Sequence, residues 1–343
     1  MNGYEKDILS QPEDIRLALD YYMKNGYAGK LLAIKPETNK RIIFTGMGSS
    51  YLSCYNVVTA LRNSGLCVMK IPASQLLHFE AGAITEDSLL VCVSQSGESA
   101  EIAALLKTLP DSANIIGVTN DVNSTLGKRA NLVLDMHVGA ERSVSTRTYL
   151  ASLAINHIMA QAFCANADGY GDIGASVRCL EEFLTDFEAV SKSADEFLSL
   201  PPYLAVIARG RSLCAAEAGA LYLMETAKFP AIAFDAGQFR HGPLELTAGE
   251  FHAVVFAPVS GCYDLQIKIA RQIAGNGGKV LLVTDSAYRG GGNINVITQR
   301  YSCADLEGFV NISVMQIIAN NFAKRKGLEV GEFFFSSKVT AVQ

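Results

Sequence analysis

Two clusters of hydroxyl side chains stand out by their spacing. The first is Gly48-Ser49-Ser50, and the second is Ser94-Gln95-Ser96-Gly97-Glu98-Ser99. Hydroxyls and free backbone amides at the start of a helix bind an anion, because the donors and the helix dipole both favour negative charge. A helix cap is the alternative, and it is the better explanation of Ser49 and Ser50 taken alone. The six-residue cluster exceeds what one cap requires, so the two loops together predict a phosphate site that needs no Walker A lysine.

A second region offers an acid and a base. Glu225 ends the largely apolar run Gly219–Met224, and a carboxyl on a buried helix can have the raised pKa that a general base needs near neutral pH. His241 lies in a loop rich in glycine and proline, where an imidazole titrates near neutrality. Taken alone, Glu225 is more typical of a helix surface, and His241 has the alternative of a capping or core histidine.

The remaining histidines do not form a metal-ligand pattern. His78, His137, His157 and His252 fall in helical or strand contexts without a recurring ligand spacing, so we expect no metal and no cofactor. Gly290-Gly291-Gly292 lies between Arg289 and Asn293 and has two interpretations, a phosphate contact or a flexible hairpin or loop. The hairpin or loop is favoured.

Short β-branched runs that alternate with helical segments must position these groups. The first half predicts strands at 41–45, 66–71, 88–93, 114–119 and 130–136, with helices at 51–64, 98–109 and 124–129. This alternation is typical of right-handed βαβ crossovers in a doubly wound parallel sheet. Ligands of such sheets bind at the carboxyl ends of the strands, and both serine clusters follow a predicted strand directly.

The second half repeats the pattern weakly. After two long predicted helices, 145–165 and 177–198, we expect strands at 203–208, 231–234, 252–257 and 279–284, with helices at 212–228, 266–274 and 311–324. A helix at 13–24 precedes the first strand, and 333–343 has no helical pattern. The predicted organisation is a helical lead-in (1–34), a first domain with the serine loops (35–168), a linking helix (169–198), a second domain with Glu225 and His241 (199–330) and a tail (331–343).

Composition supports two domains and excludes several classes of protein. The 343 residues are 49% hydrophobic and 18% charged, which suits sheets that helices cover on both faces. A net charge of −5 argues against a nucleic-acid partner. The eight cysteines are scattered as buried free thiols would be, and the apolar runs are too short to cross a membrane. The first residues lack the pattern of a signal peptide, so we expect a cytoplasmic protein.

Together the motifs resemble the sugar isomerase (SIS) family, in particular the isomerase half of glucosamine-6-phosphate synthase and the related fructosamine-6-phosphate deglycases. SQSGES is similar to the family's SQSGET, Gly48-Ser49-Ser50 to GTS, and Gly237–Pro243 to GE(L/F)(K/R)HGP. The resemblance covers nearly the whole chain, and the motifs occur in the family's order. It implies two tandem SIS domains, each a flavodoxin-like αβα sandwich.

The resemblance also implies roles for individual residues. Matches to the phosphate-binding residues are Ser50, Ser94, Gln95, Ser96 and Ser99, with Ser49 at the neighbouring threonine. Glu225 matches the base and His241 the histidine of sugar-ring opening, which the partner protomer can donate. A homodimer with shared active sites, or a higher oligomer, is therefore implied. Ser143 lies in SVSTR, similar to the family's VASTK, and Lys338 resembles the lysine that reacts with the sugar carbonyl.

Two departures bear on the substrate. Tyr222 stands where the synthase has a lysine, and Ala218 where it has a glutamate, so Tyr222 is a further candidate for substrate contact. The sequence has no glutaminase domain and no cysteine at position 2, so we do not expect glutamine to supply ammonia. The leading hypothesis is a deglycase or deaminating isomerase of a 6-phosphorylated ketosamine or amino sugar. An aldose–ketose sugar-phosphate isomerase and a non-catalytic phosphosugar-binding regulator are the alternatives.

Overall fold

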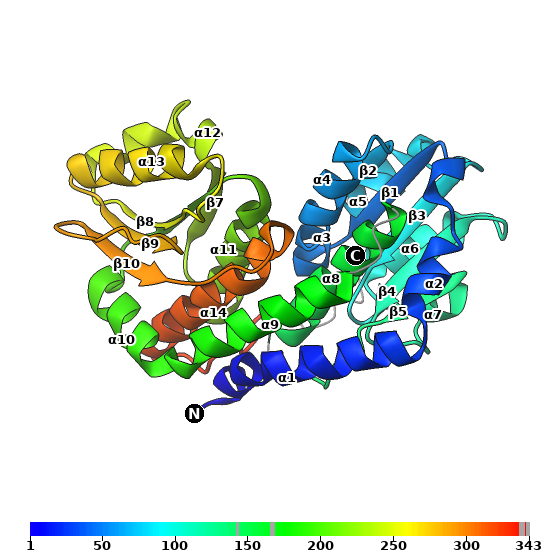
Figure 1. Ribbon diagram of the computed structural model, residues 1–343, viewed down its shortest axis with the longest axis horizontal. Coiled ribbons are helices and arrows are strands. Elements are labelled where there is room, and N and C mark those ends of the chain that lie inside the picture. Colours follow the sequence, from blue (N-terminus) through cyan, green and yellow to red (C-terminus); the bar gives the residue numbers. More distant parts are fainter. Residues whose placement is uncertain (142–143, 165–168, 336–339, 341–343) are drawn as a thin grey trace. The chain divides into compact units, whose positions relative to one another are not determined.

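The computed structural model describes residues 1–141, 144–164, 169–335 and 340. The chain divides into two compact units, the first formed mainly by Ser10–Glu141 with Ser145–Gly174 and the second mainly by Ala175–Glu332. Each unit contains a five-stranded sheet in which all paired strands are parallel. Figure 1 shows helices on both faces of each sheet. The predicted α/β class with two doubly wound domains is therefore confirmed.

The sheet of the first unit has the strand order β2-β1-β3-β4-β5. Its strands are β1 (Arg41–Gly46), β2 (Val68–Lys70), β3 (Ser88–Val93), β4 (Asn114–Thr119) and β5 (Leu132–Asp135). β3 and β4 occupy the predicted residues, and β3 is buried along its whole length, as expected where helices cover both faces. β2 is shorter than predicted because the Leu66 amide still bonds to the carbonyl of Leu61 in the preceding helix.

Helices cover both faces of this sheet. On one face, α5 (Ala73–His78), α6 (Ala100–Thr108) and α7 (Thr125–Arg129) pack their leucines against the side chains of β1, β3 and β4. On the opposite side in Figure 1, α4 (Tyr55–Asn63) contacts β2 and α8 (Arg147–Phe163). The predicted helix 51–64 is in fact two helices, α3 (Gly48–Leu52) and α4, because the Cys54 amide bonds three residues back to Tyr51 and closes α3.

The sheet of the second unit has the order β10-β9-β8-β6-β7, so it repeats the topology of the first. Its strands are β6 (Leu204–Ala208), β7 (Ala231–Asp235), β8 (His252–Phe256), β9 (Lys279–Thr284) and β10 (Ile294–Thr298). The sequence analysis missed β10, an edge strand that is only partly buried and follows the Gly290–Gly292 run. Gly291 bridges to Ile294, so that run forms the tight turn into the strand.

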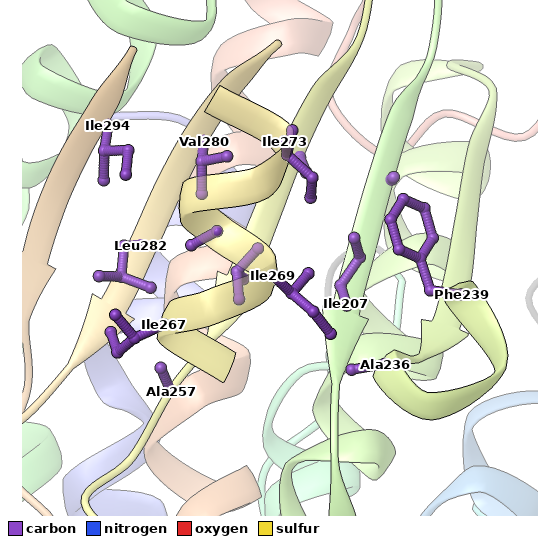
Figure 2. Close-up of a cluster of buried hydrophobic side chains, with 14 of the residues drawn as sticks. Ile207, Ala236, Phe239, Ala257, Ile267, Ile269, Ile273, Val280, Leu282 and Ile294 are labelled. Carbon is purple, nitrogen blue, oxygen red and sulfur yellow. The ribbon is translucent and has the colours of Figure 1, made fainter. Parts of the chain in front are cut away.

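The core of the second unit lies between its sheet and the helices on each face. Figure 2 shows Ile267, Ile269 and Ile273 of α13 (Tyr263–Gly275) over the strand side chains, with Phe239 of α12 (Ala236–Phe239) beside them. On the other face, α11 (Leu213–Ala227) lies on β6 and β7 and against α14 (Glu307–Arg325). A Cβ at Gly219 would come within 2.4 Å of Met315 Cγ, so this glycine permits the close approach of α11 and α14.

The remaining helices differ from the prediction in length. α1 runs from Gly3 to Lys24 rather than from Glu13, since Asn2 and Glu5 cap its start reciprocally through two 2.8 Å bonds. A short α2 (Tyr27–Leu32) follows it. The predicted helix 177–198 consists of α9 (Gly169–Thr185) and α10 (Phe187–Leu198), which are interrupted at Asp186. Among the described residues, no helix combines the length and apolar character needed to cross a membrane.

Candidate functional site

Both serine loops leave the first sheet at its topological switch point. β1 and β3 are neighbours, and the crossovers from this pair lead to β2 on one side and β4 on the other. The last residues of the two strands, Gly46 and Val93, are paired in register. Residues 47–50 and 94–99 therefore emerge side by side at the carboxyl edge, the place where open parallel sheets bind ligands.

The hydroxyls of Ser49 and Ser50 in the first loop make no hydrogen bonds to the described residues of the chain. Ser49 and Ser50 lie in the first turn of α3, whose preceding residue, Met47, supplies no side-chain cap. Neither hydroxyl makes a hydrogen bond within the described part of the chain, whereas the Ser50 carbonyl accepts from Ser53 Oγ at 2.7 Å. The helix-cap explanation therefore does not apply to these two side chains, and both hydroxyls remain able to contact a ligand.

The second loop is held by its own hydroxyls and by the end of β4. The Ser94 amide donates to the Val118 carbonyl at 2.9 Å, and Ser94 Oγ lies 3.1 Å from Ser99 Oγ. Ser96 Oγ accepts from the Glu98 amide at 3.1 Å. Ser99 directly precedes α6 but does not cap it through its side chain. The Gln95 side-chain amide has no partner among the described residues, so its N–H groups can donate hydrogen bonds to a ligand.

Gly97 allows this loop to turn back on itself. Its φ of 64° is left-handed, and an added Cβ would come within 1.9 Å of Ser124 Oγ. Glu98, the charged residue of the loop, is occupied elsewhere, since its carboxylate accepts from the Thr125 amide at 2.5 Å and from Thr125 Oγ1 at 2.8 Å at the start of α7. Sequence reasoning missed this cap. It ties the loop to α7 and accounts for the negative charge beside the hydroxyls.

Glu225 lies in the last turn of α11, where its surroundings favour the uncharged carboxyl. Its side chain is half-buried. Burial raises the pKa of Glu225 to about 7, and the positive charge of Lys228 pulls it partly back. A carboxyl with this pKa is ionised for about half of the molecules at neutral pH and can both take and return a proton there. Tyr222, one helical turn earlier, is fully buried, as is Ala218.

Lys228 is a residue of this site that sequence reasoning did not single out. It directly follows α11 and adopts a left-handed φ of 49°. Its ammonium donates to the Glu225 carbonyl at 2.5 Å and also to the Glu332 carbonyl. Lys228 follows Glu225 by three residues, and its bond to the Glu225 carbonyl keeps the two residues close together. A lysine at this spacing beside a candidate base was a detectable signal.

His241 lies after α12 in the loop between β7 and β8. Asp235 caps α12 by accepting from the amides of Gly237 and Gln238 at 2.8 and 3.0 Å. Phe239 anchors the turn in the core, and the His241 amide donates to the Gln238 carbonyl at 2.9 Å. The imidazole itself is exposed. Within the described residues, no hydrogen bond or ion pair joins it to the Glu225 carboxyl.

Two predicted site residues, Ser143 and Lys338, lie outside the described residues, although residues close to each are described. Beside Ser143, the Glu141 carboxylate accepts from the amides of Thr146 and Thr148 at 2.7 and 2.8 Å, at the start of α8. In the C-terminal tail, the Thr340 carbonyl accepts from the Ala100 amide at 2.9 Å. Thr340 therefore lies at the first residue of α6, next to Ser99 of the second serine loop.

Comparison with known families matches residues 37–162 and 201–289 to the model of the SIS domain. These two segments make up more than half of the chain. They contain both serine loops, Glu225 and His241.

Curated relatives include two enzymes named glutamine–fructose-6-phosphate aminotransferase (isomerizing). That of Sulfolobus acidocaldarius is 29% identical over 253 residues, covering 73% of this chain and 42% of the relative. That of Gluconobacter oxydans is 28% identical over 317 residues, covering 87% and 51%. The chain thus spans about half the length of the curated relatives it matches.

Solved structures share the fold at low identity. The C-terminal domain of glucosamine-fructose-6-phosphate aminotransferase from Francisella tularensis has a TM-score of 0.83 at 20% identity, with 96% of this chain and 98% of that chain covered. Tagatose-6-phosphate ketose/aldose isomerase from Escherichia coli has a TM-score of 0.84 at 16% identity, with 97% and 96% covered. Glucosamine-6-phosphate deaminase from Thermotoga maritima has a TM-score of 0.80 at 18% identity, with 98% and 99% covered.

Proposed function

Because the chain belongs to the SIS domain family, we propose that it is a phosphosugar-processing enzyme that releases an amine from a 6-phosphorylated ketosamine or amino sugar. The observation that carries the proposal is the Glu225 carboxyl, whose pKa burial raises to about 7. A glutamate on an exposed helix surface is expected to have an ordinary pKa, well below 7. A base that moves a proton between carbon atoms at neutral pH works best with a pKa near 7.

The serine loops support a phosphate as the handle of the substrate. Ser49, Ser50, Ser94, Gln95, Ser96 and Ser99 supply hydroxyl and amide donors at the switch point of the first sheet. Several of these donors have no partner among the described residues, and Glu98 is held by α7. Neutral donors of this kind bind an anion without a permanent positive charge. The printed names of the relatives and neighbours above each contain a sugar 6-phosphate.

The proposed reaction transfers a proton between C1 and C2. For a ketosamine, ionised Glu225 removes a proton from C1, and the C–H electrons form a C1–C2 double bond. The C2 carbonyl oxygen takes a second proton from a general acid, the role proposed below for His241, and becomes a hydroxyl. Return of the proton to C2 moves the double bond to C1 and nitrogen. Water then adds to this imine, and the C–N bond breaks to give the aldose phosphate and the free amine. Fixing the phosphate places the same carbon atoms beside the base in every turnover.

His241, Lys338, Ser143 and Tyr222 complete the proposal. His241 opens the sugar ring or protonates an oxygen, Lys338 stabilises developing negative charge or forms a transient imine, and Ser143 contacts the substrate. The Tyr222 side chain is fully buried in the structure, so its proposed contact with the substrate requires that the residues covering it move. We further propose a homodimer in which the partner contributes His241. In support, His241 is exposed, and apolar side chains on nearby segments are exposed as well: Met224 (46%), Ile232 on the edge strand β7 (49%) and Leu246 (45%).

A simple aldose–ketose isomerase is the second candidate, since the same base and phosphate handle would serve it. The solved ketose/aldose isomerase, whose chain is almost wholly covered, supports the fold for this activity as well. The two reactions differ in whether an amine leaves. A non-catalytic phosphosugar-binding regulator is the third reading, and it predicts binding without turnover.

One experiment separates the three. The protein is screened by thermal shift against 6-phosphosugars and their unphosphorylated counterparts, because a ligand that binds the native state raises its Tm. Those that bind are assayed for amine release from fructosamine 6-phosphates and for interconversion of fructose and glucose 6-phosphates. Amine release supports the deamination proposal, interconversion alone supports the isomerase, and binding alone supports the regulator. If no phosphosugar binds, all three are wrong.

The Glu225→Gln variant tests the base. The amide keeps the shape of the side chain but cannot accept a proton from carbon, so turnover should fall by at least about 100-fold. The thermal shift given by the phosphosugar should stay close to that of the wild type, since the serine loops are unchanged. Turnover that persists in this variant would remove Glu225 from the role of base.

A further inference from the structure

We propose that Lys228 is a positioning residue for the base: it clasps the end of α11 to the segment that follows α14, and it holds a positive charge beside the Glu225 carboxyl. This inference rests on the proposed role of Glu225. It adds a residue that neither the motifs nor the resemblance assigned.

The backbone at Lys228 is the first reason to look for a role. α11 ends at Ala227, and Lys228 closes it in the left-handed conformation at φ 49°, while the Phe229 amide donates back to the Leu223 carbonyl at 3.1 Å. Glycine is the usual residue at this position of a helix end, because a side chain there is strained. We therefore expect the bonds of the lysine side chain to offset the free-energy cost of this backbone conformation.

The Lys228 side chain donates to carbonyls in distant parts of the second unit. Nζ donates to the Glu225 carbonyl at 2.5 Å, one of the last carbonyls of α11 that have no partner within the helix. It also donates to the Glu332 carbonyl, 104 residues along the chain. In return, Lys326 Nζ donates to the Lys228 carbonyl at 2.7 Å. These bonds therefore connect the end of α11, including the backbone of the proposed base Glu225, to residues 326–332.

This clasp lies where the C-terminal tail departs. Glu332 precedes Lys338 by six positions in the sequence, and Lys338 is the proposed carbonyl-reacting lysine. By bonding to the carbonyls of Glu332 and Glu225 with one ammonium, Lys228 holds the Glu332 backbone at the end of the helix that carries the proposed base.

The charge of Lys228 acts on the same carboxyl. Burial raises the pKa of Glu225, and the Lys228 ammonium lowers it, so the two oppose each other and leave it at about 7. Charged groups that act on the ammonium within the described part of the chain include Glu225, Glu332 and Lys326, and burial lowers the pKa of Lys228. Without the ammonium, the Glu225 carboxyl would keep its proton to higher pH, and less of the base would be ionised in the neutral range.

The test measures the pH dependence of turnover in four variants. In Lys228→Met the acidic limb of kcat/KM should move to higher pH by on the order of one unit, with a loss of kcat at pH 7 larger than any change in KM. Lys228→Arg keeps the charge and should restore the limb. Lys228→Gly relieves the backbone strain, so it should fold at least as well as the wild type and still show the shifted limb. Lys268→Met removes an exposed lysine of α13 as a matched charge control and should leave the limb in place.

The outcome separates this inference from the proposed function. If Lys228→Gly is folded and its acidic limb coincides with that of the wild type, the inference is wrong. The role of Glu225 as the base is judged separately, by the Glu225→Gln variant. If the wild type turns over no phosphosugar, carboxyl carbon NMR with labelled glutamate reports the Glu225 titration directly, with Glu225→Gln identifying the signal. An unchanged Glu225 titration in Lys228→Met would then overturn the inference without any assay of activity.

Discussion

At the scale of single residues, the chemistry of Glu225 depends on two opposed effects. Burial favours the neutral carboxyl, and the Lys228 ammonium favours the ionised one, which together leave the pKa at about 7. An ordinary glutamate would be fully ionised at this pH and would be a weaker base for a proton on carbon. The functional property thus comes from the neighbours of the residue more than from its type.

The pH dependence of the reaction follows from this pKa. In the proposed mechanism Glu225 must be ionised to remove a proton, so kcat/KM should rise about tenfold per pH unit below pH 7 and level off above it. The midpoint of this rise should lie near 7 rather than near the usual value for a glutamate. A pH–rate profile of the wild-type protein between pH 4 and 9, at phosphosugar concentrations well below KM, checks this. A rise centred near pH 4.5 would contradict the assignment of Glu225.

Gly97 offers a test of the serine loop that does not touch a hydroxyl. Gly97→Ala adds a Cβ at a left-handed φ of 64° and 1.9 Å from Ser124 Oγ, so the loop must shift. We expect a loss of about 1–3 kcal/mol in the free energy of unfolding and a marked rise in KM for the phosphosugar.

A matched glycine controls for the added methyl group. Gly82→Ala lies in the same unit, has no atom within 4 Å of the new Cβ and does not have a positive φ. It should leave both the stability and KM close to those of the wild type in denaturant unfolding and steady-state kinetics. Equal effects of the two substitutions would show that the strain at Gly97 does not shape the loop.

At the scale of elements, α14 contributes another carboxyl whose pKa is raised by burial. Glu307 begins this helix with 6% of its surface exposed and accepts from Ser212 Oγ at 3.0 Å, in the turn before α11. Ser212 Oγ also accepts from Asn311 Nδ2 at 3.0 Å, and Tyr301 donates to Asn311 Oδ1 at 2.6 Å. Burial raises the pKa of Glu307 to about 7, against the lowering effects of the Ser212 bond and the Arg211 charge. The network joins α14 to the beginning of the helix that carries Glu225, the proposed base.

This carboxyl predicts a pH-dependent stability. Its folded pKa exceeds the unfolded value, so its contribution to stability is complete at acid pH and is lost as the pH rises through 7. In Glu307→Gln the side chain does not ionise, so the variant does not lose this stability at high pH. Its amide oxygen can still accept the hydrogen bond from Ser212. It should raise the free energy of unfolding by about 1–3 kcal/mol at pH 8 and by little at pH 5. Urea unfolding of both proteins at the two pH values measures this, and a variant that is less stable at pH 8 would contradict it.

At the scale of the whole molecule, the proposed dimer explains features that one chain leaves open. The imidazole of His241 is exposed, and β7 is an edge strand with Ile232 49% exposed. An exposed apolar edge strand is a liability in a monomer and is commonly covered by another chain. A second copy that covers this edge would bury the exposed apolar side chains of this region.

Complementation tests whether active sites are shared. Glu225→Gln and His241→Asn should each be inactive as pure proteins. When their subunits are exchanged, half of the dimers are mixed, and each mixed dimer has one site with both wild-type residues, so about a quarter of the wild-type activity should return. Sedimentation or light scattering measures whether the protein is a dimer. Mixtures that stay inactive after demonstrated subunit exchange would show that each site uses the His241 of its own chain.

The sequence by itself determined the fold class, the strands of both sheets except β10, and the serine loops as the place to look for an anion. These succeed because buried parallel strands are continuous apolar runs, and because the carboxyl edge of such sheets binds ligands whatever the sequence elsewhere. Shared motifs also singled out Glu225 and His241. Their roles, and those of Ser143 and Lys338, stay predictions.

Only the tertiary structure decided which groups surround these residues. The Glu98 cap on Thr125, the bond from Lys228 to Glu332 and the network of Ser212 with Glu307 join residues that are 27, 104 and 95 positions apart. No local pattern reports such pairs, because periodicity and turn chemistry describe only neighbouring residues. The pKa of Glu225 depends on such packing, since burial is a property of the folded chain.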